Sequence, residues 1–301
     1  MNLNVRLALA FLAVYTIWGS TYLAIRFVIE TIPPFLMAGT RFLIAGGFLF
    51  IWAVMRGASR PSLLHWRSAF VIGGFMLLGG HGAVIWTEQW VPSGMVSLLI
   101  STVPLWMVLI DWRLSGAKPG KVATGGILLG FLGIILLVVS AESFGQSYID
   151  PVGAVIVVCG AFLWAYGSLY SRSSHLPSSP LLAIGMEMIA GGVLLLFASL
   201  VTGELTGIQL SMVSLRSWLS WVYLIVFGSL IGFTSYIWLL RTTTTARVST
   251  YAYVNPIVAM FLGWALANEP INAGNLVAAT IILAAVVLIT TRQTIKKPEP
   301  P

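Results

Sequence analysis

Ten long apolar stretches, separated by short polar joints, occupy almost the whole chain of 301 residues. A helix needs about 20 apolar residues to cross the hydrocarbon core of a bilayer. The first stretch is too long for a removable signal peptide, and no small-x-small cleavage pattern follows it. The sequence therefore predicts an all-α polytopic membrane protein without a soluble domain. The predicted spans are 7–28, 34–55, 69–90, 92–113, 121–140, 152–171, 180–201, 218–240, 247–267 and 272–291.

The composition excludes the soluble classes of protein. Apolar residues make up 58% of the chain and charged residues 8%, whereas roughly 25% of an average soluble protein is charged. A soluble fold of this length could not hide so much apolar surface. The net charge of +7 is scattered between the apolar stretches, so no basic face is available for nucleic acid. The single cysteine, Cys159, allows neither an internal disulfide nor a multi-cysteine metal site. The expected partner is the lipid bilayer, and no cofactor or metal is expected.

Lysine and arginine residues gather in alternate joints, which predicts the orientation of the chain. The opposite joints hold Arg216 alone. The positive-inside rule therefore predicts a plasma (inner) membrane protein with both termini in the cytoplasm and a short disordered cytoplasmic tail at 292–301. The residues of the basic joints are Arg6, Arg56, Arg60, Arg67, Arg113, Lys118, Lys121, Arg172, Arg241, Arg247, Arg292, Lys296 and Lys297.

The two halves of the chain resemble each other. An offset of 146 residues aligns Trp18 with Trp164, and an offset of 152 aligns Pro104 with Pro256. The predicted copies are residues 7–140 and residues 152–291, with five helices each. Because five is odd, the second copy must enter the membrane upside down. Inverted repeats of this kind are a recurrent design of secondary transporters. The further aligned pairs are Arg26 with Arg172, Gly39 with Gly185, Gly46 with Gly192, Gly80 with Gly232 and Trp86 with Trp238.

Four segments carry a family resemblance. IWGSTYLAIRF (17–27), PPFLMAGTRFLIAGG (33–47) and EQWVPSGMVSLLISTVPLW (88–106) resemble the first copy of an EamA-type module, and TTTTARVSTYAYVNPIVAMFLGWALANEP (242–270) resembles the end of the second. Such modules belong to the drug/metabolite transporter superfamily. The resemblance implies a ten-helix carrier, usually an exporter of small metabolites, amino acids or drugs, and it does not name the cargo.

Two tryptophans and two prolines lie near the middle of their spans, where secondary carriers bind their cargo. Trp18 and Trp164 favour a cavity lining, and packing between helices is the alternative. Pro104 and Pro256 interrupt corresponding helices, which would free carbonyls for a cargo ammonium or only help packing. The predicted substrate cavity comprises Trp18, Tyr22, His81, Ser101, Pro104, Trp164, Tyr253, Asn255 and Pro256.

Three ionisable residues inside the spans are candidates for a gate or for proton coupling, namely Arg41, His81 and Glu187. Arg41 and Glu187 occupy equivalent positions of the repeat, but helical rise places them about 10 Å apart in depth. We therefore expect separate roles, with Arg41 bound to carbonyls or an outer-gate partner and Glu187 as a coupling acid or inner-gate residue. His81 suits proton coupling, and a neutral hydrogen-bonded histidine is the alternative.

The chain lacks G-x-x-x-x-G-K-[ST], H-E-x-x-H and G-x-S-x-G patterns, so neither a nucleotide motor nor a common hydrolase is encoded. The sequence predicts a non-enzymatic carrier of small molecules that works by alternating access, with export as the family habit. A passive channel or an intramembrane enzyme is the alternative. With Arg41 as its deep cation, the expected cargo is neutral, zwitterionic or a lipophilic cation, held on aromatic faces. The oligomeric state is left open.

Overall fold

Prolines and capping side chains fix where several helices begin. The computed structural model describes residues 2–116, 118, 120–143, 150–206, 209–271 and 273–293. Pro34, Pro151 and Pro180 each stand in the first turn of a helix, where a missing N–H costs nothing. The side chain of Asp150 accepts a hydrogen bond from the Val152 N–H at 3.0 Å, as helix-capping residues do.

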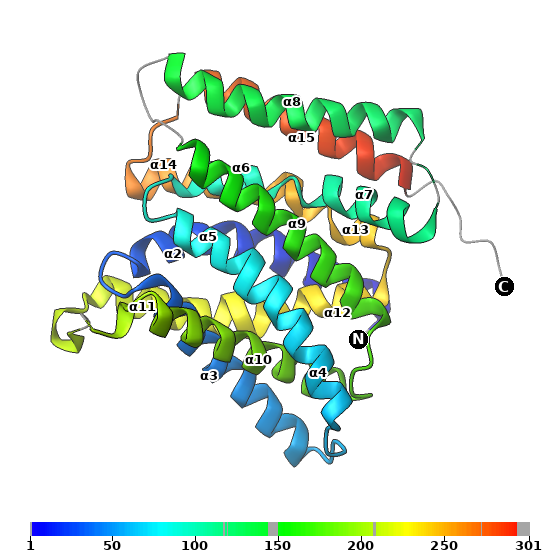
Figure 1. Cartoon of the computed structure of the whole chain (residues 1–301), viewed down its shortest axis with the longest axis vertical. Helices are drawn as coiled ribbons and strands as arrows, with labels where there is room; N and C mark the ends of the chain where they lie inside the picture. Colours follow the sequence, from blue (N-terminus) through cyan, green and yellow to red (C-terminus); the bar gives the residue numbers. More distant parts are fainter. Residues whose placement is uncertain are drawn as a thin grey trace.

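Within the described residues the fold is helical throughout (Figure 1). Three spans contain a π-helical segment (η1, η2 and η5), and the fourth and ninth spans are each divided in two. The first half comprises α1 (Leu3–Leu12), η1 (Ala13–Ile17), α2 (Trp18–Val28), α3 (Pro34–Met55), α4 (Leu63–Ile72), η2 (Gly73–His81), α5 (Gly82–Thr87), α6 (Ser93–Ile100), α7 (Val103–Ser115) and α8 (Lys121–Ser143). The second half comprises α9 (Pro151–Ser173), α10 (Pro180–Val201), η3 (Glu204–Thr206), η4 (Leu210–Met212), α11 (Leu215–Tyr223), η5 (Leu224–Phe233), α12 (Thr234–Thr242), α13 (Thr245–Val248), α14 (Tyr251–Ala267) and α15 (Ala273–Gln293).

The ten predicted spans correspond to the helices of the structure. In the part of the chain that the structure describes, seven helical stretches are long and apolar enough to cross a membrane, and three more apolar stretches are shorter, at Lys121–Leu136, Tyr251–Ala267 and Leu276–Leu288. The span predicted at 69–90 begins earlier, at Leu63, and ends at Thr87. The predicted tail, 292–301, lies outside the described residues from residue 294 onward.

The packing of α3 against α10 shows the inversion of the repeat (Figure 1). A methyl group on Gly46 would lie 2.8 Å from the Gly185 carbonyl oxygen, and one on Gly192 would lie 3.0 Å from the Gly39 carbonyl oxygen. The sequence offset aligns Gly39 with Gly185 and Gly46 with Gly192. Gly46 therefore contacts Gly185, the counterpart of Gly39, while Gly39 contacts Gly192, the counterpart of Gly46. A two-fold axis between antiparallel helices requires this reciprocal arrangement. The small residues allow the backbones to touch, which is how helices associate in membranes.

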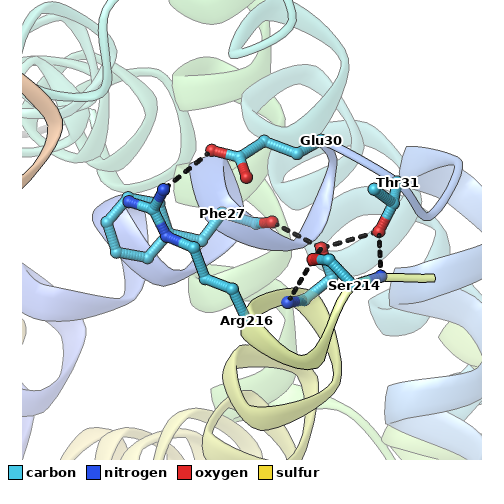
Figure 2. A network of polar contacts seen from close by, with 6 residues as sticks. Phe27, Glu30, Thr31, Ser214 and Arg216 are labelled. Carbon is cyan, nitrogen blue, oxygen red and sulfur yellow. Dashed lines mark hydrogen bonds and ion pairs between the residues drawn. The ribbon is translucent and has the colours of Figure 1, made fainter.

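Figure 2 shows a polar network that joins the end of α2 to the start of α11. The Ser217 hydroxyl donates to the Phe27 carbonyl oxygen at 2.8 Å and accepts from the Thr31 hydroxyl at 2.7 Å. Beside it, Arg216 lies 3.5 Å from the Glu30 carboxylate and stacks over the Phe27 ring. Arg216, the single cation of the opposite joints, is therefore paired with an acid at the same end of the bundle.

Candidate functional site

A cavity lies at the centre of the bundle, between helices of both halves. The space open to the centre of a water molecule is about 70 Å³, which suits a few waters or one small chemical group. Its wall is mainly aromatic, with three polar side chains. The aromatic residues are Trp18, Tyr22, Phe42, Trp164, Phe233 and Tyr251, and the polar side chains are Thr21, Arg41 and His81.

The two predicted tryptophans meet in this cavity. The rings of Trp18 and Trp164 lie edge to face, with centroids 5.6 Å apart. Both also contact the Tyr236 ring, at 4.9 Å from Trp18 and 5.5 Å from Trp164. The Trp18 indole N–H donates to the Gly228 carbonyl oxygen at 3.2 Å, and the Trp164 indole N–H donates to the Tyr236 hydroxyl at 3.1 Å. Each indole is therefore held by a residue from the second half of the chain.

Glycines of the third and eighth spans make room for these indoles. A methyl group on Gly232 would lie 2.7 Å from Cδ1 of Trp18, and one on Gly80 would lie 3.0 Å from Cβ of Trp164. Since the repeat aligns Gly80 with Gly232 and Trp18 with Trp164, the two contacts are the same contact made twice. The cavity thus lies on the pseudo-two-fold axis.

Arg41 gives the cavity its positive charge. Its side chain is buried, Nε donates to the Ser229 hydroxyl at 2.8 Å, and Nη1 lies 3.5 Å from Nε2 of His81. A guanidinium can only donate, so this contact requires Nε2 of a neutral His81 to accept. The guanidinium carbon also lies 4.6 Å from the Phe42 ring centre. No acidic residue is among the described residues that line the cavity.

Glu187 lies outside the cavity wall and pairs with a different arginine. Its carboxylate is fully buried, and Oε1 lies 3.6 Å from Nη2 of Arg241 at the end of α12. The structure thus places Arg41 and Glu187 in separate contacts, as the difference in depth predicts. Arg41 binds a hydroxyl and a histidine rather than backbone carbonyls.

The remaining predicted cavity residues bind other parts of the protein. The Ser101 hydroxyl donates to the Leu98 carbonyl oxygen at 2.5 Å, inside the two-residue break that precedes Pro104. The Thr102 hydroxyl likewise donates to the Leu99 carbonyl oxygen at 2.8 Å. These two carbonyls of the broken helix are therefore already bonded. Pro256 instead lies inside the continuous helix α14.

Tyr253 and Asn255 hold α14 against neighbouring helices. The Tyr253 hydroxyl donates to the Val286 carbonyl oxygen of α15 at 3.0 Å. With its amide oriented to donate, Asn255 bonds the Tyr15 carbonyl oxygen at 3.0 Å and that of Val14 at 3.2 Å. Both acceptors belong to η1, so Asn255 supports the π-helical segment that directly precedes Trp18.

Sequence reasoning missed two tyrosines and the π-helical segments. Tyr236 and Tyr251 complete the aromatic cluster around Trp18. The segments η2 (Gly73–His81) and η5 (Leu224–Phe233) coincide under the 152-residue offset, and both contribute to the cavity wall. Segments of this kind are frequent at functional sites. The glycine pairs inside these segments were the available sequence signal for close contact between helices. They do not reveal the extra residue in each π-helical turn.

Comparisons with known proteins agree with this architecture. The model of the EamA-like transporter family matches residues 6–139 and again residues 151–291. The chain is 40% identical over 283 residues to the uncharacterized inner membrane transporter YedA of Escherichia coli (strain K12), covering 93% of this chain and 89% of that protein. It is 25% identical over 292 residues to the uncharacterized transporter YvbV of Bacillus subtilis (strain 168), covering 97% of this chain and 93% of that protein.

A solved crystal structure shares the fold, with a TM-score of 0.67 and 18% sequence identity, over 98% of this chain and 100% of that one. The family that matches both halves is one of transporters, so the chain has a transport role and is not an enzyme. Its apolar helices make it a multi-pass membrane protein. It belongs to the EamA-like transporter family, within the drug/metabolite transporter superfamily.

Proposed function

We propose that this protein is a secondary transporter of the plasma (inner) membrane that exports small zwitterionic metabolites, with amino acids as the main class, by alternating access. The cargo would place its carboxylate against Arg41 and its apolar body against Trp18 and Trp164. The observation that carries this proposal is that Arg41 is the single charged side chain among the described residues of a wall that is otherwise aromatic, apolar or neutral.

The position of Arg41 favours a carboxylate over a cation. Its Nε already donates to Ser229, while the one polar contact of Nη1 with the described part of the chain is the long one of 3.5 Å to His81. Guanidinium N–H groups that are not fully engaged can bind a carboxylate through charge-assisted hydrogen bonds. A lipophilic cation would meet the aromatic faces favourably but would also face the guanidinium with no acid to offset it. Cationic drugs are therefore the second candidate cargo.

The size of the cavity supports a mechanism with moving helices. Sites for drug-sized ligands usually enclose about 300–1,000 Å³, far more than the open space found here. Helices must separate before a metabolite can enter, which a carrier does in each cycle and a permanently open channel does not. The inverted packing of α3 on α10 supplies two similar halves that can exchange conformations.

The orientation rests on the distribution of positive charge. With both termini in the cytoplasm, the joints rich in lysine and arginine lie inside, and the network around Arg216 and Glu30 lies outside. The direction of transport, outward, is carried over from the family.

Counterflow in proteoliposomes tests the proposal. A radiolabelled aromatic amino acid would be exchanged against the unlabelled compound, its amide, its methyl ester and a cationic dye. We expect saturable exchange in which only compounds with a free carboxylate compete. Arg41→Gln should lower the apparent affinity of the competing carboxylate compound by about 10-fold or more, because a hydrogen bond to a charged group contributes about 1.5–3 kcal/mol. Arg56→Gln, at the exposed end of α3, is the control. Competition by the dye but not by the carboxylate would overturn the choice of cargo, and flux that does not saturate would indicate a channel.

A further inference from the structure

Glu88 is the residue directly after the third span, and its carboxyl group is completely buried. It caps the carboxyl end of α5, with its N–H donating to the Val84 carbonyl oxygen at 3.0 Å. Val84 lines the central cavity. Glu88 therefore lies one helical turn beyond the cavity wall, toward the end of the bundle that holds Glu30 and Arg216.

Neither carboxyl oxygen of Glu88 has a hydrogen-bond partner among the described residues. The nearby cation, Arg26, is directed elsewhere: its Nη1 donates to the backbone carbonyl oxygen of Glu88 at 2.6 Å. A buried carboxylate without hydrogen bonds is strongly unfavourable. The carboxyl end of a helix also carries partial negative charge, which further disfavours a second negative charge there.

Glu269 is the other acid in this region, and its environment is the opposite one. Helix α14 is capped at its carboxyl end by Asn268, whose positive φ of 52° is tolerated by asparagine and turns the chain back toward α6. Glu269 Oε1 then accepts from the Ser93 N–H at 2.8 Å, and Oε2 accepts from the Ser93 hydroxyl at 3.0 Å and the Gly94 N–H at 3.2 Å. A carboxylate is stable at the amino end of a helix, so Glu269 holds the negative charge.

The carboxyl groups of Glu88 and Glu269 therefore lie in very different environments. Burial, and then the negative charge of Glu269, hold the pKa of Glu88 well above its usual range, and the positive charge of Arg26 only partly opposes them. Two acids in such different surroundings commonly divide the roles of proton holder and anion.

We propose that Glu88 is a proton-binding site that links the opening of this end of the transporter to pH. The carboxyl group is buried only in its protonated form, and it releases the proton to the adjoining solution when the ends of α5 and α6 separate. The inference deepens the proposed function, since it relies on alternating access for the opening movement. It differs from the predicted coupling residues, His81 and Glu187, which lie within the spans.

The described groups around Glu88 are consistent with a single proton site. From α2 it faces Arg26 and Tyr22, and from the connection after α14 it faces Glu269. Helices α9 and α3 also pack on α5. Helix α9 contacts α5 where Gly153 lies beside Thr87, and α3 contacts it where Phe35 stacks on Trp86; neither Gly153 nor Phe35 titrates. Tyr22 also lines the cavity, so the proton site and the cargo site share a wall residue.

The direction of the pH effect follows from linkage. A group whose pKa is higher in the closed form than in the open form binds more protons when closed. Lowering the pH therefore favours closure at this end. Raising the pH toward the pKa of the buried group removes that preference and favours opening.

Infrared spectroscopy of the purified full-length protein in nanodiscs tests the site without any cargo. We expect the carbonyl stretching band of a protonated carboxylic acid near neutral pH. The band should disappear in Glu88→Gln, shift in Glu88→Asp and persist in Glu30→Gln, a control acid that is half-exposed. Absence of the band from the wild-type protein, or its removal only by Glu187→Gln, would overturn the proposal.

A transport measurement gives a second readout. Wild-type exchange in proteoliposomes should depend on the pH at the Glu88 side, Glu88→Gln should flatten that dependence, and Glu30→Gln should keep it. A pH profile of Glu88→Gln that matches the wild type would contradict the proposal. If no exchange of any cargo occurs, the proposed function fails, while the infrared band still decides whether Glu88 holds a proton.

Discussion

Trp18 and Trp164, equivalent residues of the two halves, meet edge to face at the centre of the bundle, with an interplanar angle of 79°. Each indole packs against a glycine of an equivalent helix segment, Gly232 for Trp18 and Gly80 for Trp164. Residues far from a symmetry axis cannot contact their own counterparts. The pair therefore lies at the axis about which the two halves would exchange conformations.

Removing either indole should weaken cargo binding. An aromatic contact contributes about 0.5–1.5 kcal/mol beyond the area it buries, so we expect the KM for transport to rise several-fold in Trp18→Ala and in Trp164→Ala. Trp264→Ala is the control, because that side chain is 56% exposed at the outside of the bundle. Kinetics in proteoliposomes, at matched protein content, measure the effect. An unchanged KM in both variants would exclude these residues from the cargo site.

Two adjacent glycines of α3 should respond oppositely to alanine. A methyl group on Gly46 would lie 2.8 Å from the Gly185 carbonyl oxygen, whereas one on Gly47 would meet nothing within 4 Å. Overpacking of this kind costs about 1–3 kcal/mol, while alanine in an open helical position is favourable by roughly 0.5–1 kcal/mol. Thermal unfolding in detergent should show a lower midpoint for Gly46→Ala and an equal or higher one for Gly47→Ala. Equal destabilisation by both substitutions would argue against the close contact of α3 and α10.

The Glu187–Arg241 pair should be more sensitive to loss of one partner than to loss of both. Glu187 is fully buried and its carboxyl oxygens make no hydrogen bonds to any residue that the structure describes, so Arg241 at 3.6 Å is its main compensation. Breaking a buried pair on one side costs about 3–5 kcal/mol. We expect Arg241→Gln to be strongly destabilised and Arg241→Gln with Glu187→Gln to recover part of the loss. A double-mutant cycle measured by urea or thermal unfolding gives the coupling, and strictly additive effects would mean that the pair does not interact.

Neighbouring residues of the network in Figure 2 should differ in their contribution to stability. Ser217 is fully buried, and its hydroxyl bonds Phe27, Thr31 and Ser214. Ser217→Ala would leave a carbonyl and two hydroxyls short of a hydrogen-bond partner. Each buried polar group left without a partner lowers the free energy of unfolding by about 1–3 kcal/mol.

Arg216→Ala is the matched comparison at the adjacent position. The ion pair of Arg216 with Glu30 is nearly half-exposed on both sides, and such pairs contribute about 0–1 kcal/mol. Thermal unfolding should therefore rank Ser217→Ala as the less stable variant, and the effect of Arg216→Ala should shrink further with added salt. The reverse ranking would assign the stability of this joint to the ion pair.

The amino-acid sequence determined the spans and the inversion, and it predicted the depth of each residue. The length of each hydrophobic stretch and the alternation of basic joints depend only on the chain and the bilayer, so they can be inferred from the order of the residues alone. Depth was enough to place Trp18 and Trp164 near the centre and to separate Arg41 from Glu187. The paired glycines likewise marked where helices approach closely.

Only the tertiary structure decided which way each side chain faces. In a membrane both the lipid-facing and the packed sides of a helix are apolar, so periodicity does not fix its rotation. The π-helical segments η1, η2 and η5 add a further shift in phase that no pattern of residues announces. Tyr236 and Tyr251 therefore entered the aromatic cluster unpredicted, while Tyr253 and Asn255 bind neighbouring helices. Glu88 lies near the end of the span predicted at 69–90, and the sequence alone did not indicate that packing around the end of α5 buries its carboxyl group.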